Sequence, residues 1–394
     1  MKRLLYISGA PRVSLDARTS NQAARNHILS VMEGFKRKGY PTSKYIFGDY
    51  LPKSFHTEQA ADQLASSNTT KILADLFRVF CGFFNQIVVV LLYVWRVDFT
   101  YERFGAFQAG GMLLRLLGKP WILETNAILY EESSKESKTV LLKNLAKWME
   151  GWAYRNCTVL VCISSSLKDS IADHFGIPKD KILVSRNGVD PTFFNGDKCE
   201  EKPEDQPLNI GYVGSLAAWQ NLSKLVDAIG MLDSELQKQV RCTIIGDGPF
   251  MKELVASAKE KGLSDLVDFK GQVPLKEVPQ HLCQFDVGYC YPEHKSDLAS
   301  DTFNSPMKLY EYFSMGKPAI CKINEDIKRM NHYEQFTYDV SGKSLDGLIA
   351  EVLQNKSQLR AQGLIARKEI VESHSWDARI EAMLEGIRKI GPKI

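Results

Sequence analysis

The stretch SPMKLYEYFSMGKP, Ser305 to Pro318, places a lysine and a glutamate one helical turn apart, directly after a proline that can start a helix. A helix beginning at Pro306 would direct its free backbone N–H groups and the positive end of its dipole toward an anion. Lys308 could then contact phosphate oxygens, and Glu311 could accept hydrogen bonds from the two hydroxyls of a ribose. The alternative is an ordinary amphipathic helix whose apolar side packs on a core.

Four further blocks precede this stretch in the second half of the chain. They are VSRNGVDPTFF (Val184–Phe194), IGYVGSLAAWQNLSKLVDAI (Ile210–Ile229), CTIIGDGPFMKELV (Cys242–Val255) and VDFKGQVPLKEVPQHL (Val267–Leu282). Together with SPMKLYEYFSMGKP, they resemble the nucleotide-sugar domain of the retaining glycosyltransferase family 4, which has the GT-B fold. The resemblance implies an α/β protein with two doubly wound, Rossmann-like domains that face each other across a cleft.

The first half of the chain extends the resemblance to nearly the whole length. FTYERFGAFQAG (Phe99–Gly110) and KPWILETNAILYEE (Lys119–Glu132) look like the acceptor-side blocks of one branch of the same family. The resemblance therefore implies that the first domain binds the acceptor and the second binds the donor.

Length and patterning agree with two domains. A chain of 394 residues, 44% of them apolar, exceeds the size at which single cores stop growing, about 250 to 300 residues. Short apolar runs alternate with longer amphipathic ones, which is typical of βα units and parallel sheets. The predicted strands lie at 3–9, 43–49, 99–104, 120–125, 158–164 and 181–187 in the first half, and at 208–214, 240–248, 266–272, 285–291 and 317–322 in the second. We predict a first domain over residues 1–194, a polar and acidic linker over 195–207, and a nucleotide-sugar domain over 208–376. By the resemblance, a final helix over 377–394 packs back on the first domain.

Cysteine spacing and charge bear on the setting. The eight cysteines lack CxxC pairs, which favours a reducing, cytoplasmic compartment and argues against a disulfide framework or a zinc site. Residues 1–190 carry 25 Lys and Arg against 17 Asp and Glu, whereas the remainder carries 25 against 30. A basic first half suits an anionic membrane or a phosphate-bearing acceptor, although a solvated basic surface explains it as well. Nucleic acid is not expected as a partner, because no recognisable binding motif is present.

The longest apolar stretch runs from Val79 to Trp95 and is interrupted by Asn85 and Gln86. A bilayer span needs about 20 apolar residues, so this stretch lies at the lower limit. Three interpretations stay open: a buried helix or helix plus strand, a surface element that touches a membrane, and a true span. A peripheral contact of the first domain with the inner face of the membrane is therefore one of the expectations.

The donor-side glycines fall in turns that follow predicted strands. The turn GYVGS could hold a pyrophosphate with its amides, and GDGP shapes the donor cleft in the family. GDGP is not a dinucleotide fingerprint, because Met251 occupies the position of the third glycine. The donor-binding residues expected in this way are Gly214, Ser215, Gln220, Gly246, Gly248, Gly271, Val273, Asn304, Ser305, Pro306, Met307, Lys308, Leu309 and Glu311.

Two departures from the family pattern affect this site. The family has two glutamates eight residues apart; Glu311 matches the second, but Phe303 stands at the first, so Asp301 or the backbone amides of 304–307 would have to hold the sugar. Many members also carry an arginine and a lysine where this chain has Ser215 and Gln220. Lys308 thus becomes the main cation for the leaving diphosphate. Because no DxD motif occurs, neither metal nor cofactor is expected beside the UDP- or GDP-linked donor.

On the acceptor side, the strand end ILETN resembles a place where many family members present a histidine. Glu124 and Asn126 stand there instead. Asn126 could hydrogen-bond the sugar, and Glu124 could orient Arg103, although a purely structural Glu124–Arg103 pair is an equal alternative. The loop after the first strand adds three acceptor-side candidates, which are Gly9, Arg12 and Arg18.

By this resemblance we expect a retaining, metal-independent glycosyltransferase that moves a sugar from a nucleoside diphosphate to a hydroxyl of a saccharide or lipid-linked acceptor, in polysaccharide or glycoconjugate biosynthesis. The residues expected to be catalytic are Lys308, Glu311, Asn126 and Glu124. A catalytically silent sensor or scaffold that binds sugar nucleotides is one alternative. Another GT-B enzyme, such as a sugar-nucleotide epimerase, is the second.

Overall fold

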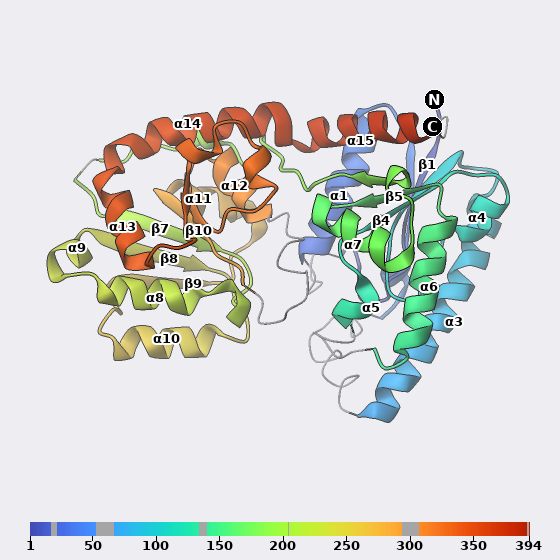
Figure 1. Cartoon of the computed structure of the whole chain (residues 1–394), viewed down its shortest axis with the longest axis horizontal. Coiled ribbons are helices and arrows are strands. Elements are labelled where there is room, and N and C mark those ends of the chain that lie inside the picture. The colour runs from blue at the N-terminus through green and yellow to red at the C-terminus, as the bar shows by residue number, and fades with distance from the viewer. Residues whose placement is uncertain (17–21, 53–66, 134–139, 204, 294–306, 392–393) are drawn as a thin grey trace. The chain divides into compact units, whose positions relative to one another are not determined.

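The computed structural model describes residues 1–16, 22–52, 67–133, 140–203, 205–293, 307–391 and 394. Within these residues the chain forms two compact units. The first comprises Met1–Arg186 and Trp376–Ile394, and the second comprises Asn187–Ser375. Each unit is built on a six-stranded sheet with helices on both of its faces (Figure 1). The chain is therefore an α/β protein with two doubly wound units, as the sequence predicts.

The first sheet has the strand order β2-β1-β3-β4-β5-β6, and every neighbouring pair is parallel. Three of its six strands are buried along their whole length, because helices cover both faces of the sheet. The strands lie where the sequence predicts them: β1 (Leu4–Ser8), β2 (Thr42–Ile46), β3 (Phe99–Arg103), β4 (Trp121–Thr125), β5 (Val159–Cys162) and β6 (Ile182–Val184).

The C-terminal helix belongs to the first unit and packs on its first helix. A Cβ atom on Gly34 would lie 2.7 Å from Cγ1 of Ile380, so only glycine allows the two helices to approach this closely. The helices of this unit are α1 (Gln22–Arg37), α3 (Asn68–Tyr93), α4 (Met112–Leu116), α5 (Leu129–Glu131), α6 (Lys143–Asn156), α7 (Ser165–Phe175) and α15 (Trp376–Ile390).

The second sheet has the strand order β12-β11-β10-β7-β8-β9, again with parallel neighbours. Its last strand, β12, was not predicted from the sequence. The strands are β7 (Leu208–Val213), β8 (Val240–Ile245), β9 (Val267–Gly271), β10 (Val287–Cys290), β11 (Ala319–Cys321) and β12 (Thr337–Asp339). The helices are α8 (Leu222–Met231), α9 (Ser234–Lys238), α10 (Met251–Glu260), α11 (Val278–Cys283), α12 (Met307–Ser314), α13 (Leu345–Gln354) and α14 (Leu359–Glu369).

Both sheets contain a point at which the strand order reverses. In the first unit β1 lies between β2 and β3, and in the second unit β7 lies between β8 and β10. Ligands of open α/β sheets bind beyond the carboxyl ends of the strands at such a point. The candidate residues named above follow these strands or their neighbours.

The stretch 195–207, predicted as a linker, packs onto the second unit. Arg367 on α14 donates hydrogen bonds to Asn195 and forms an ion pair with Asp197, with 2.6 Å between nitrogen and oxygen in each case. Cys199 in this stretch forms a disulfide with Cys283. The expectation of a chain without disulfides was therefore wrong, because two cysteines 84 residues apart meet only in the folded unit. The other six cysteines are free and buried.

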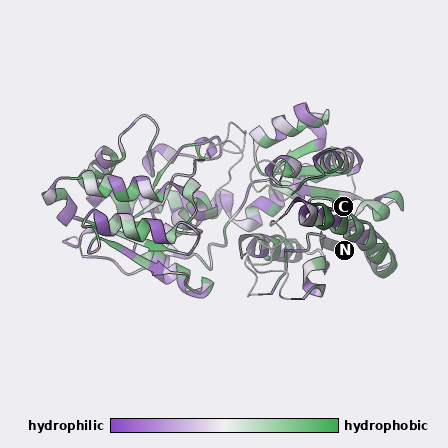
Figure 2. Cartoon of the chain, turned by 90° about the horizontal axis from the view of Figure 1, so that it is seen from below, coloured by the Kyte–Doolittle hydropathy of each residue, from purple (hydrophilic) through white to green (hydrophobic). Residues whose placement is uncertain are grey.

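The apolar stretch that starts at Val79 lies in the single long helix α3, and not in a helix followed by a strand. This helix is long and apolar enough to cross a membrane by length and composition, with 28% of its most apolar window buried. Hydrophobic residues occur along most of the length of α3 (Figure 2). Its β-branched run is only partly covered, since Ile87 is exposed and Val89 is buried.

Candidate active site

The glycine turns after β7 and β8 pack against each other in the second unit. Gly246 has a φ of +133°, and a Cβ atom on it would lie 1.8 Å from the carbonyl oxygen of Gly214. A Cβ atom on Gly248 would lie 2.5 Å from the carbonyl oxygen of Leu216. The amide of Gly214 donates to the carbonyl of Ile245 (2.9 Å). This amide, which we expected to face a pyrophosphate, is therefore engaged within the protein.

Lys308 reaches these turns from the first helical turn of α12. Its Nζ donates to the hydroxyl of Tyr212 (2.9 Å) and to Oε1 of Gln220 (2.8 Å), and it lies 4.2 Å from the centre of the Tyr212 ring. A Cβ atom on Gly214 would lie 3.3 Å from Nζ. Among the described residues, Tyr212 and Gln220 thus take two of the three ammonium protons, and the third can be donated to a ligand.

Glu311 lies one turn beyond Lys308 on the same helix and keeps partial exposure to solvent. Desolvation by the surrounding protein raises the pKa of Glu311 to about 7, although the charge of Lys308 opposes this shift. The carboxyl group is therefore partly protonated near neutral pH. Ionised, it is an acceptor for hydroxyl groups, whereas its protonated form accepts more weakly.

We expect the affinity for a nucleotide sugar to rise about three- to fourfold between pH 6 and pH 8, because ionised Glu311 accepts stronger hydrogen bonds from the ribose by about 1 kcal/mol. Calorimetric titration would measure this. The intact nucleotide sugar must be used, because a terminal phosphate itself titrates near pH 6.

The raised pKa of Glu311 also implies that the free energy of unfolding falls as pH rises from about 4.5 to 7, since the folded chain holds a proton that the unfolded chain releases.

Glu311→Gln is the matched control for this pH dependence, because it keeps the shape of the side chain and cannot ionise. Its affinity should be nearly constant between pH 6 and pH 8. An equal rise in Glu311→Gln and the unmodified chain would show that another group controls the titration.

The remaining donor-side candidates lie in different surroundings. Gly271, with a φ of +68°, accepts a hydrogen bond from the Gly246 amide (2.8 Å) and joins the third strand end to the glycine turns. Val273 packs partly on the core, and the side chain of Leu309 is buried in it, so only the backbone of Leu309 remains accessible. Ser215 is exposed, Gln220 is buried, and Met307 is partly exposed. Three donor-side candidates, Asn304, Ser305 and Pro306, lie outside the described residues, as do Asp301 and Phe303.

In the first unit, Arg103 and Glu124 occupy paired positions at the carboxyl ends of β3 and β4. Oε1 of Glu124 lies 3.7 Å from Nη1 of Arg103 and 3.1 Å from Nε2 of His27. The Tyr101 hydroxyl donates to Oε2 of Glu124 (2.7 Å). With its amide oriented to satisfy both groups, Asn126 accepts from Arg103 (2.8 Å) and donates to Glu124 (3.1 Å). The structure thus brings the predicted residues Arg103, Glu124 and Asn126 into contact, and His27 is a fourth member of the cluster.

The tautomer of His27 follows from its neighbours. Nδ1 lies 2.9 Å from Nη1 of Arg103, which can only donate, so Nδ1 accepts and the proton of the neutral ring sits on Nε2, facing Glu124. Burial opposes the ionisation of Glu124, but His27, the Arg103 charge and the Tyr101 hydrogen bond outweigh it and hold the pKa of Glu124 well below its usual value. Glu124 is therefore held as a hydrogen-bond acceptor for His27 and Tyr101.

Arg103 and Asn126 are the partly exposed members of this cluster, whereas Glu124 and His27 are buried. A ligand would thus meet Arg103 and Asn126, with Glu124 holding them from behind. Gly9 follows Ser8, which is paired in register with Arg103. Arg12 lies further along the same loop and is partly exposed, and Arg18 lies outside the described residues. His27 had no sequence signal, because it is one histidine on an amphipathic helix.

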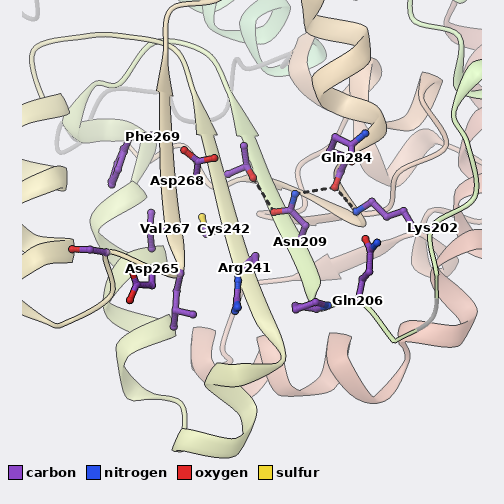
Figure 3. Close-up of a pocket in the computed structure, with 14 residues that line it drawn as sticks. Lys202, Gln206, Asn209, Arg241, Cys242, Asp265, Val267, Asp268, Phe269 and Gln284 are labelled. Atoms are coloured by element: carbon purple, nitrogen blue, oxygen red, sulfur yellow. Dashed lines mark hydrogen bonds between the residues drawn. The ribbon is translucent and has the colours of Figure 1, made fainter.

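A pocket of about 570 Å³ lies elsewhere, at the amino ends of β7, β8 and β9 (Figure 3). Lys202 at this pocket is paired with Asp286 (3.1 Å), and Asn209 donates to the carbonyl of Gln284 (2.8 Å). The pocket lies at the opposite end of the strands from Lys308, whereas ligands of parallel sheets bind at the carboxyl ends of strands. The geometry of the glycine turns is therefore the better guide to the donor site.

Comparison with known proteins covers both units. Residues 196–369 match the profile described as Glycosyl transferases group 1, and residues 103–193 match the one described as Glycosyltransferase Family 4. The chain is 24% identical over 193 residues to a 2-deoxystreptamine glucosyltransferase of Streptomyces kanamyceticus, covering 46% of this chain and 49% of the relative. It thus spans about half the length of this curated relative.

Two further similarities are informative. The chain is 23% identical over 241 residues to a GDP-mannose-dependent alpha-(1-6)-phosphatidylinositol monomannoside mannosyltransferase of Mycobacterium tuberculosis, covering 58% of this chain and 61% of the relative. The crystal structure of the Anabaena protein HepE in complex with UDP is similar with a TM-score of 0.66 at 13% identity, covering 98% of this chain and all of that one. The fold is therefore GT-B.

Proposed function

Because the chain belongs to glycosyltransferase family 4, we propose that it transfers a sugar, with retention of anomeric configuration, from a UDP- or GDP-linked donor to a hydroxyl of a saccharide or lipid-linked acceptor. The observation that carries the proposal is the position of Lys308. Its ammonium group lies beside the glycine turns, held by Tyr212 and Gln220, with Glu311 one turn further along α12. This arrangement offers a cation to a diphosphate and an acceptor to a ribose.

In the proposed reaction the bond between the anomeric carbon and the diphosphate oxygen breaks as the acceptor oxygen bonds to the same face of the sugar. The leaving diphosphate takes the proton of the acceptor hydroxyl, so no protein nucleophile is needed. Lys308 stabilises the charge that develops on the leaving group. Transfer then needs no metal ion, because the ammonium and the N-terminus of α12 supply the positive potential.

Arg103 and Asn126 are the proposed acceptor contacts, with Glu124 and His27 as positioning residues. Glu124 holds both the guanidinium and the amide, so it fixes the donors and acceptors that they present. We place the reaction in polysaccharide or glycoconjugate synthesis, in the cytoplasm and at the inner face of the membrane. The names of the curated relatives, which include a transferase acting on a phosphatidylinositol mannoside, support such acceptors.

The test begins with calorimetric titration of UDP, GDP and their common sugar conjugates into the full chain, with and without EDTA. The conjugate that binds best is then incubated with saccharide and lipid-linked acceptors, and release of nucleoside diphosphate is followed. NMR of the product reports the anomeric configuration. We expect binding that EDTA does not weaken and a product with the configuration of the donor.

Each other outcome contradicts a defined part of the proposal. Binding without turnover on any acceptor would favour a sensor or scaffold. Loss of binding in EDTA would overturn metal independence, and an inverted product would overturn retention. If epimerised nucleotide sugar accumulates without acceptor, the chain is an epimerase with the same fold.

A further inference from the structure

Helix α3 is amphipathic in the opposite sense to a helix on the surface of a soluble domain. Between Ile72 and Leu92, all exposed side chains are apolar, with exposed fractions from 39% to 75%, and they recur every three or four residues. A surface helix normally turns its apolar stripe toward the core. We call these residues the α3 apolar face: Ile72, Leu73, Leu76, Phe77, Phe80, Phe83, Phe84, Ile87, Leu91 and Leu92.

Three polar residues of α3, Asp75, Asn85 and Gln86, are buried against the protein. Asp75 is fully buried and accepts hydrogen bonds from the amides of Leu141 (2.8 Å) and Leu142 (3.0 Å). Asn85 is also buried; it accepts from the Tyr45 hydroxyl (2.7 Å) and donates to Gln108 (3.3 Å). These partners fix the rotation of the helix about its axis. The apolar face therefore points outward as a consequence of the fold.

The same polar contacts argue against a bilayer span. The helix has 26 residues and meets the length and composition of a span. A span would carry Asp75 and Asn85 into hydrocarbon and remove the partners that satisfy them, and charged groups there are costly. The arrangement instead suits a helix that lies in the plane of a membrane surface with only its apolar face inserted.

The size and chemistry of the face select a bilayer over a protein partner. Ten half-exposed aliphatic and aromatic side chains amount to on the order of 1,000 Å² of apolar surface, above the few hundred Å² of the largest patch on an ordinary monomer. Protein interfaces of this size carry about one hydrogen bond per 100 to 200 Å². No side chain of this face can donate or accept one, which fits hydrocarbon.

The surroundings of the face add charge and interfacial groups. Trp95, 86% exposed, follows the helix, and tryptophan is enriched where membrane meets water. Helix α4 packs on α3, and Leu116 and Leu117 at its end are exposed. Arg96 and Arg115 are exposed cations beside these apolar residues. Basic residues next to an inserted face are attracted by anionic lipid.

We propose that the α3 apolar face docks this chain, in the plane of the membrane, on a bilayer that contains anionic lipid. The proposal deepens the membrane-side location given under the proposed function and is independent of the residues assigned to donor or acceptor. It can therefore be tested without turnover, and its failure would leave the transferase assignment standing.

The test is flotation of the purified full chain with vesicles of phosphatidylcholine alone and of phosphatidylcholine with about a third phosphatidylglycerol. The variant Phe80→Asn/Phe83→Asn removes two exposed rings from the centre of the face. The matched control, Met231→Asn/Leu364→Asn, changes two similarly exposed apolar residues of the second unit. Circular dichroism and nucleotide-sugar binding check that each variant is folded, and sedimentation without lipid reports the oligomeric state.

We expect the unmodified chain and the control to float with anionic vesicles, at least tenfold more than with phosphatidylcholine alone, and the phenylalanine variant to lose at least tenfold in partitioning. Equal partitioning of the phenylalanine variant would overturn the assignment of this face. If the unmodified chain does not float, the proposal fails. Dimers that the phenylalanine variant abolishes would then identify a second copy as the occupant, whereas a monomer would point to a different protein.

Discussion

Lys308→Ala is expected to lower turnover by about 100-fold or more, on the order of 3 kcal/mol of transition-state stabilisation. The ammonium group is the cation that the structure places at the glycine turns, 2.9 Å from the Tyr212 hydroxyl and 2.8 Å from Gln220. In the proposed reaction, charge on the leaving diphosphate grows as its bond to the sugar breaks, so the loss should fall mainly on kcat. Steady-state kinetics with the donor identified by calorimetry would measure it.

Two variants make this result interpretable. Lys308→Met keeps most of the aliphatic stem beside the Tyr212 ring and removes the ammonium, so it should lose as much turnover as Lys308→Ala with less disturbance of packing. Lys276→Ala removes an exposed lysine from another loop of the same unit and should leave turnover unchanged. Turnover of Lys308→Met within threefold of the unmodified chain would contradict the role assigned to the charge.

Glu124→Ala is expected to lower the free energy of unfolding of the first unit by about 3 to 5 kcal/mol, because it leaves the charged guanidinium of Arg103 without its buried carboxylate partner. The Glu124 carboxylate accepts hydrogen bonds from Nε2 of His27 (3.1 Å) and from the Tyr101 hydroxyl (2.7 Å), and it lies 3.7 Å from Nη1 of Arg103. Urea unfolding followed by tryptophan fluorescence would measure the change. Five of the six tryptophans belong to the first unit, so the signal reports mainly on it.

The controls for Glu124 separate charge from shape. Glu33→Ala removes an exposed glutamate from α1 and should change the free energy of unfolding by less than about 0.5 kcal/mol. Glu124→Gln keeps the side-chain volume and one oxygen acceptor, so we expect an intermediate loss. An unfolding curve of Glu124→Ala that superimposes on that of the unmodified chain would show that the ion pair contributes nothing to stability.

Much of the architecture was predictable from local pattern. Apolar runs such as those of β1 and β5 are buried on both sides, and parallel strands require this composition whatever their order in the sheet. The short strand β12 was missed because its three residues, Thr337–Asp339, carry too little pattern to separate a strand from a loop. The disulfide between Cys199 and Cys283 was missed because pairing depends on distance in space, which spacing along the chain does not reveal.

The candidate site shows the same division. Lys308, Gln220, Arg103, Glu124 and Asn126 were named from sequence blocks that occur together in one family. That Lys308 donates to Gln220, 88 residues away, depends on where α12 meets the turn after β7. His27 could not be found in this way, because α1 brings it to Glu124 from a part of the chain without a motif.

Short motifs and the period of the apolar pattern were enough to predict the family, the two α/β units and the candidate donor and acceptor residues. Which side of α3 is buried could not be predicted in this way, because it depends on contacts with distant parts of the chain. Asp75 and Asn85 of this helix find their partners in Leu141, Leu142, Tyr45 and Gln108, all distant in the chain. A helical pattern specifies that two faces differ, whereas long-range hydrogen bonds decide which of them turns toward the protein.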